Sequence, residues 1–183
     1  VATASFLSAC YTGVKGGMVL LTADDPTMHS SQNEQDNRFY AKQALVPMFE
    51  PSTAQEAKDM MKYAFEFSEK FNTIVLYRTT TRLNHGRGDL TLGEIQKLDR
   101  DYEFDKTEKN RCKNSPQTTP HNKLKLLERL QKVAEFANEF PFNEVKNIDG
   151  AKVGIISSGV AYAHTLDVMN MLDLNEEASI LKL

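Results

Sequence analysis

The sequence lacks the features that mark several protein classes. Its two cysteines, Cys10 and Cys112, stand far apart and outside any Cys-x-x-Cys spacing. We therefore expect no iron–sulfur cluster bound by this chain, and a reducing compartment, the cytoplasm. No apolar run approaches the roughly 18 residues of a membrane span, and no signal peptide pattern is present. The net charge of −3, without a dominant basic patch, argues against nucleic-acid binding.

The four histidines are scattered, and no histidine or carboxylate cluster has the spacing of metal ligands. We therefore predict no protein-ligated metal. Spacing alone also identifies no Ser-His-Asp arrangement, so no catalytic residue is assigned.

The first half of the chain alternates between strand and helix patterns, which predicts an α/β fold with a parallel sheet and flanking helices. The expected elements are a helix over residues 4–14, a buried strand over 18–23, a short edge or irregular strand over 45–49, a helix over 52–71 and a strand over 73–78. A short helix is also expected near Phe39 and Ala44.

Two local features refine the 52–71 helix. Ser52 is the expected N-cap, with Gln55 as its capping-box partner. One buried face is expected to contain Ala57, Met60, Met61, Ala64, Phe65 and Phe71.

The most informative segment is a dense polar run, residues 29–38, which we call the first polar loop. It contains no glycine, and every side chain can donate or accept hydrogen bonds. It follows the 18–23 strand and the breaker Asp24-Asp25-Pro26. In an open α/β sheet, ligands bind outside the carboxyl ends of the strands, so this loop is a candidate site. A solvated surface loop is the alternative.

A second polar loop, residues 79–88, follows the 73–78 strand and is expected on the same rim. The guanidinium groups of Arg38, Arg78, Arg82 and Arg87 can bind a carboxylate in a forked geometry or stay solvated. Asp24 and Asp25 can serve as acid–base groups, although Asp25 before Pro26 is also a plain turn signal.

The character of the chain changes after residue 88. Residues 101–120 are charged and rich in helix breakers, which predicts a mobile connection. A helix over 121–140 is expected to dock through Leu124, Leu127, Leu130, Ala134 and Ala137. A strand over 153–157, a turn at Ser158-Gly159 and a helix over 160–172 then begin a second unit. That turn is either a weak phosphate-site signal or an ordinary strand–helix turn.

Several segments, in order, resemble the alpha subunit of the indolepyruvate ferredoxin oxidoreductase family. They are Tyr11 to Gly17, Ala23 to Pro26, His29 to Arg38, Glu50 to Ser52, Arg78 to Arg82 and Lys152 to Tyr162. The Asp-Asp-Pro and His-Ser-Ser-Gln-Asn-Glu-Gln-Asp stretches are the most specific. The segment from about residue 101 to 120 matches poorly.

The resemblance implies a thiamine-diphosphate-dependent 2-oxoacid oxidoreductase of the cytoplasm. It implies oxidative decarboxylation of arylpyruvates with coenzyme A as acyl acceptor, and electron transfer through [4Fe-4S] clusters to ferredoxin. The implied partners are a beta subunit and ferredoxin, with no nucleic acid and no membrane. The implied layout is a partial pyrimidine-binding-type domain over residues 1–88, a linker with a docking helix over 89–148 and the start of a transketolase C-terminal-like domain over 149–183.

The family's catalytic glutamate is expected before Val1, and its Mg²⁺ motif and cluster cysteines after Leu183. We therefore expect none of these cofactors to bind this chain alone. The active-site or substrate loop is expected to comprise His29, Ser30, Ser31, Gln32, Asn33, Gln35, Asp36 and Arg38, joined by Arg82 and His85. The alternatives are a non-catalytic α/β interaction module and a related oxidoreductase with another 2-oxoacid substrate.

Overall fold

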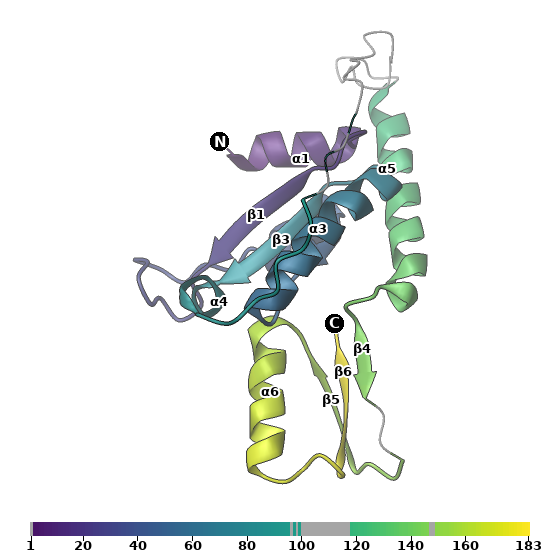
Figure 1. The fold of residues 1–183 in the computed structure, drawn as a ribbon. Helices are drawn as coiled ribbons and strands as arrows, with labels where there is room; N and C mark the ends of the chain where they lie inside the picture. The colour runs from purple at the N-terminus through teal and green to yellow at the C-terminus, as the bar shows by residue number, and fades with distance from the viewer. Residues whose placement is uncertain (1, 96, 98, 100–117, 147–148) are drawn as a thin grey trace.

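The computed structural model describes residues 2–95, 97, 99, 118–146 and 149–183. Within these residues the strands form two three-stranded sheets (Figure 1). The first sheet is fully parallel and has the order β1-β3-β2, where β1 is Val19–Asp24, β2 is Met48–Phe49 and β3 is Val75–Thr80. Helices lie on both of its faces, which confirms the predicted α/β class with a parallel sheet.

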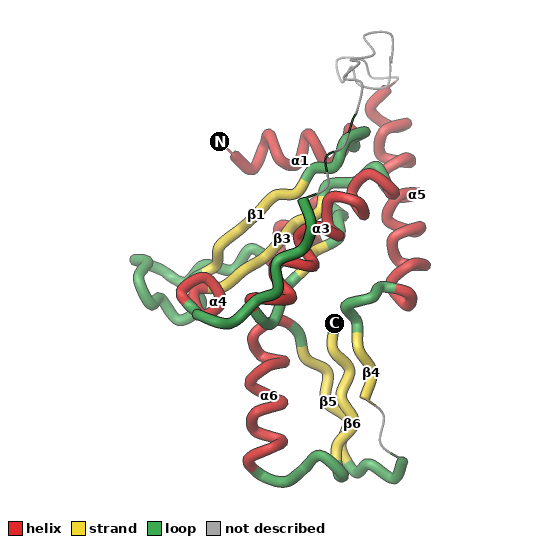
Figure 2. Tube along the Cα trace, viewed as in Figure 1, coloured by secondary structure: helices red, strands yellow, loops and turns green. Residues whose placement is uncertain are grey.

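Helices lie against opposite faces of the first sheet (Figure 2). A hydrophobic cluster holds them on each face. On one face, α1 (Ala2–Thr12) and α2 (Arg38–Ala44) pack against Ile74 and Leu76. On the other face, α3 (Ala54–Phe71) packs against Val75 and Tyr77. Successive side chains of a strand point to opposite faces, so β3 contributes to both clusters and all six of its residues are buried.

β1 is an edge strand, and the expectation that it is buried was wrong. Leu21 is 57% exposed, although Leu20 packs against the α1 cluster. The difference arises because β3, and not β1, occupies the centre of the sheet. β2 lies at the other edge, where Pro47 just before it can be accommodated.

α3 begins one residue later than predicted. Its N-cap is Thr53, whose hydroxyl accepts a hydrogen bond of 3.2 Å from the N–H of Glu56. The Glu56 carboxylate in turn accepts a hydrogen bond of 2.7 Å from the N–H of Ser52. The expected pair of Ser52 and Gln55 was therefore wrong, because the overlapping Thr53–Glu56 pair offers a charged acceptor.

The buried face of α3 also differs from the expected one at two aromatic residues, Phe65 and Phe67. Met60 and Ala64 are buried as predicted, and Phe67 joins them at 3% exposure. Phe65 is 47% exposed, contrary to the prediction. Phe67 is surrounded by Phe49, Phe71, Phe136 and Phe140, with ring centroids within 6.2 Å, so this aromatic cluster determines which phenylalanine of α3 is buried.

α5 (Thr118–Phe136) is followed by a short 3₁₀ helix, Ala137–Glu139, so the expected helix over 121–140 ends earlier. Its predicted docking face was wrong: Leu124 and Leu127 are 59% and 43% exposed, whereas Leu126 is 1% exposed.

The buried face of α5 contains a charged residue with a specific role. Arg129 Nη2 donates hydrogen bonds to the carbonyl oxygens of Cys10 (2.8 Å) and Tyr11 (3.3 Å), near the carboxyl end of α1. The last carbonyl oxygens of a helix point out of its end, where a positively charged donor interacts favourably with them. The same burial lowers the pKa of Arg129.

The second sheet has the order β4-β6-β5 and mixed direction. β5 (Val153–Ser157) pairs in parallel with β6 (Ala178–Lys182), and β4 (Glu144–Lys146) pairs with β6 in the antiparallel sense. β4 therefore lies in the stretch expected to be a connection. Residues 101–117 of the predicted mobile connection lie outside the described residues, and its last three residues, 118–120, belong to α5. α6 (Gly159–Met171) packs on one face of this sheet through Tyr162 and Met169.

The carboxyl ends of the two sheets face each other, as Figure 1 shows where β5 runs up toward the end of β3. Thr80 at the end of β3 and Ser158 just after β5 line one cavity. Lys182 at the end of β6 forms a buried ion pair with Glu56 near the start of α3. The region between the sheets is thus built from strand ends and helix starts of both units, which is where ligands bind in α/β folds.

Candidate functional site

Asp25 organises the start of the first polar loop. It is 4% exposed, and its carboxylate accepts hydrogen bonds from the backbone N–H groups of His29 (3.0 Å), Ser30 (2.8 Å) and Ser31 (2.8 Å). The hydroxyl of Thr81 donates a further bond of 2.7 Å from the other side. These donors, led by the N–H of Ser30, hold the pKa of Asp25 well below its usual range.

This carboxylate supports an unusual backbone conformation. Thr27 and Met28 have φ values of 64° and 56°, in the left-handed region that residues other than glycine rarely adopt. Such positions persist where the surrounding structure fixes them, and the three N–H groups bound by Asp25 follow directly along the chain. Asp25 thus has a structural role in shaping the loop.

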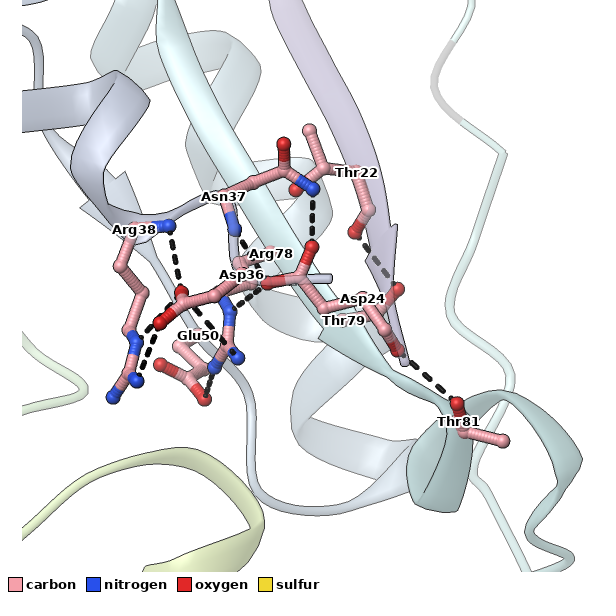
Figure 3. A network of polar contacts seen from close by, with 9 residues as sticks. All are labelled: Thr22, Asp24, Asp36, Asn37, Arg38, Glu50, Arg78, Thr79 and Thr81. Carbon is pink, nitrogen blue, oxygen red and sulfur yellow. Dashed lines mark hydrogen bonds and ion pairs between the residues drawn. The ribbon is translucent and has the colours of Figure 1, made fainter. Parts of the chain in front are cut away.

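Asp24 organises the end of the same loop together with Arg78 (Figure 3). Asp24 is 1% exposed and accepts hydrogen bonds from the N–H of Asn37 (2.9 Å) and from the Asn37 side-chain amide. Arg78, 4% exposed, donates to Asp24 from Nε (2.5 Å) and to Glu50 from Nη1 (2.5 Å). Asp36 approaches Arg78 Nη2 to 4.0 Å. The buried guanidinium of Arg78 on β3 thus links the end of β1 to the residue that follows β2.

Arg38 forms an exposed pair with Asp36 at the margin of this network. Its Nε and Nη2 donate to the two carboxylate oxygens of Asp36 at 2.9 and 2.7 Å. This forked pairing, led by the hydrogen bond from Arg38, lowers the pKa of Asp36 to about 2. Arg38 and Arg78 therefore already hold carboxylates of this chain.

A cavity of about 430 Å³ lies between the carboxyl ends of the two sheets, in the size range of ligand pockets. His29 and Arg38 line it from the first polar loop, and Arg82 lines it from α4 (Thr81–His85). Ser158 and His164 line it from the second unit. The cavity thus joins three of the ten predicted site residues.

The other predicted site residues lie elsewhere on the rim. Ser30 and Ser31 are used in the turn around Asp25, and Asp36 pairs with Arg38. The side chains of Gln32, Asn33, Gln35 and His85 are exposed and do not line the cavity.

The sequence reasoning missed the contribution of the second unit. His164, one of four scattered histidines that sequence analysis assigned to no site, lines the cavity together with Ser158 and Val160. The available signal was the position of Ser158-Gly159 at the carboxyl end of a parallel strand, the same criterion that identified the first polar loop. Glu50 was also missed, although it follows an expected strand directly.

The described ranges contain no group of three His, Cys, Asp or Glu residues that could hold a metal ion. Among the helices of these ranges, none combines the length and the apolar character needed to cross a membrane.

Comparison with known proteins finds relatives that share one name, indolepyruvate oxidoreductase subunit IorA. Over its whole length the chain is 46% identical to the indolepyruvate oxidoreductase subunit IorA of Thermococcus kodakarensis, of which it covers 29%. It is 45% identical over 96% of its length to the same subunit of Archaeoglobus fulgidus, of which it covers 28%. The chain therefore spans less than a third of the length of these curated relatives. No protein-family model matches it.

A solved structure supports the fold independently. The 2-oxoglutarate:ferredoxin oxidoreductase of Magnetococcus marinus, with 2-oxoglutarate, coenzyme A and succinyl-CoA bound, aligns with 99% of this chain and 43% of its own. The TM-score is 0.55 and the sequence identity 17%, so this similarity concerns the fold alone.

Proposed function

Because this chain belongs to the family of the indolepyruvate oxidoreductase subunits IorA, we propose that it contributes to the alpha subunit of a 2-oxoacid:ferredoxin oxidoreductase. The proposed reaction is the oxidative decarboxylation of arylpyruvates such as indolepyruvate to acyl-CoA, with electrons passing to ferredoxin. The observation that carries a site role for this chain is the convergence of His29, Arg38 and Arg82 on one cavity between two sheet ends.

Thiamine diphosphate and Mg²⁺, which the family implies, do not fit a site made by these residues alone. The described ranges offer no cluster of metal ligands, and the acids nearest the cavity are engaged with Arg38 and Arg78. We assign no step of the cofactor chemistry to this chain. Its proposed role is to orient substrate and to close the rim against the cofactor-bearing parts of the enzyme.

The proposed assembly follows from the same family membership. A beta subunit and ferredoxin are the proposed partners, [4Fe-4S] clusters carry the electrons in the complete enzyme, and the cytoplasm is the proposed location. We further propose that residues 1–88 form part of a pyrimidine-binding-type domain, that residues 89–148 connect the two units and that residues 149–183 start a transketolase C-terminal-like domain.

Substitution in the assembled enzyme tests the site role. His29→Ala and Arg38→Ala should each lower the rate of indolepyruvate-dependent ferredoxin reduction at least tenfold, about 1.4 kcal/mol of barrier. Both side chains are exposed, so the melting temperature should change little. Lys62→Ala is the matched control, because Lys62 is exposed on α3 and lies outside the cavity lining.

The remaining outcomes separate the alternatives. Full turnover in both variants would show that the rim takes no part in the reaction, as in a non-catalytic interaction module. Loss of turnover with indolepyruvate but not with another 2-oxoacid would assign the loop to substrate choice.

A further inference from the structure

Three arginines and one carboxylate line the cavity. Its lining contains Arg38, Arg78 and Arg82, with Glu50 as the lining carboxylate. Glu50 and Asp24 offset Arg78, and Asp36 offsets Arg38. Arg82 makes no ion pair with any described residue and is exposed. One guanidinium on the wall is thus available to a ligand.

One buried hydroxyl without a hydrogen-bond partner in the described part of the chain belongs to the same walls. The Thr80 hydroxyl is buried and has no hydrogen-bond partner among the described residues, and Thr80 as a whole is 8% exposed. Thr80 lies two residues after Arg78 on β3, so both side chains point to the same face, and both line the cavity. A buried hydroxyl without a partner is uncommon in native proteins and calls for an explanation such as a ligand.

The third element is the start of α6, on the opposite wall. Ser158 is its N-cap, but the Ser158 side chain makes no capping hydrogen bond, and Ser158, Val160 and Ala161 line the cavity. The first N–H groups of a helix lack internal partners and attract anions. Glu50 approaches the helix at Gly159, where a Cβ would lie 2.5 Å from Glu50 Oε1, but Arg78 offsets its charge.

We propose that this cavity is an oxyanion subsite that binds a phosphate or carboxylate group between Arg82, the Thr80 hydroxyl and the N-terminus of α6. His29 and His164 lie on its walls as further donors. An arginine fork together with helix N–H groups is the combination that binds such groups tightly. The subsite itself rests on the geometry of this chain. Its natural source rests on the proposed function, which supplies a coenzyme A phosphate and a 2-oxoacid carboxylate.

Histidine NMR provides a test with internal controls, because two of the four histidines line the cavity and His85 and His121 do not. Inorganic phosphate is titrated into the ¹⁵N-labelled chain at constant pH and ionic strength, and the ring signals are assigned by single His→Gln substitutions. The signals of His29 and His164 should shift and saturate while the other two stay fixed. Arg82→Gln and Thr80→Val should each weaken phosphate binding, Arg82→Gln by at least tenfold.

Lys62→Gln removes the same charge from an exposed site on α3 and should leave phosphate binding unchanged. Absence of a saturable shift, equal shifts at all four histidines, or equal weakening by Arg82→Gln and Lys62→Gln would each overturn the subsite.

A competition arm then separates the subsite from the proposed function. Displacement of phosphate by coenzyme A would assign the subsite to a coenzyme phosphate, and displacement by indolepyruvate would assign it to the substrate carboxylate. Phosphate binding that neither compound displaces would leave the subsite in place and overturn its link to the oxidoreductase reaction.

Discussion

The two polar loops at the rim use their side chains differently. In the first polar loop, the buried carboxylates of Asp24 and Asp25 bind the backbone at both ends, and Arg38 pairs with Asp36. In the second polar loop, Thr81 is bonded to Asp25, whereas Arg82 and His85 make no side-chain hydrogen bond with a described residue.

The difference shows that a high density of polar residues does not by itself measure how much of a loop is available to a ligand. The first polar loop uses much of its polarity to stabilise its own conformation. Arg82, in the second polar loop, makes no ion pair or side-chain hydrogen bond with a described residue, so its donors are available to a ligand. A buried group and an exposed group of the same type therefore offer direct tests of the contrast.

The largest expected effect is on the buried guanidinium. Arg78→Ala leaves Asp24 and Glu50 without their shared partner, and should lower the free energy of unfolding by about 3–5 kcal/mol. Arg38→Ala removes an exposed pair and should cost about 0–1 kcal/mol. Urea unfolding of both variants measures the difference. Similar losses in the two variants would remove the distinction between the two arginines.

The fold was predictable where local rules decide. Gly13 ends α1 with a φ of 76°, and β1 ends at Asp24, where the predicted breaker Asp24-Asp25-Pro26 begins. The end of β3 was predicted two residues too early, because β3 extends to Thr80 and α4 follows where a polar loop was expected. The α5 face was not predictable, because Leu124 and Leu127 share one helical stripe and Leu126 lies on another. Which stripe is buried depends on α1 and α3, far away in the sequence.

The site was predictable only in part, for the same reason. Position after a strand placed both polar loops at the rim. The fixing role of Asp24 required knowledge of the Arg78 partner that lies 54 residues later. His164 joins the cavity because the second unit lies against the first, and no local pattern encodes that arrangement.

Acid should weaken the first polar loop selectively. The pKa of Asp25 is lowered in the folded state, so its ionised form stabilises the fold above the ordinary unfolded pKa of about 3.9. This contribution is lost as the pH falls from about 4 toward the lower folded value. Asp25→Asn should therefore melt well below the wild type at pH 6, with a gap that narrows by pH 3. Thermal melts across this range measure the gap, and a gap independent of pH would exclude ionised Asp25 as the anchor.

The smallest effect is expected within the first polar loop itself, between two asparagines. Asn33 is exposed, and Asn33→Ala should change the free energy of unfolding by no more than about 0.5 kcal/mol. Asn37 donates to the buried Asp24 from its backbone N–H and from its side-chain amide. Asn37→Ala removes only the amide donor, and the loss of this hydrogen bond to a charged group should cost about 1.5–3 kcal/mol. The same substitution four residues apart keeps the change in side chain constant, so the difference in urea midpoints reports the anchoring alone. A cost at Asn33 as large as that at Asn37 would mean that the exposed middle of the loop is also held by the fold, and the middle would then not be free to contact substrate.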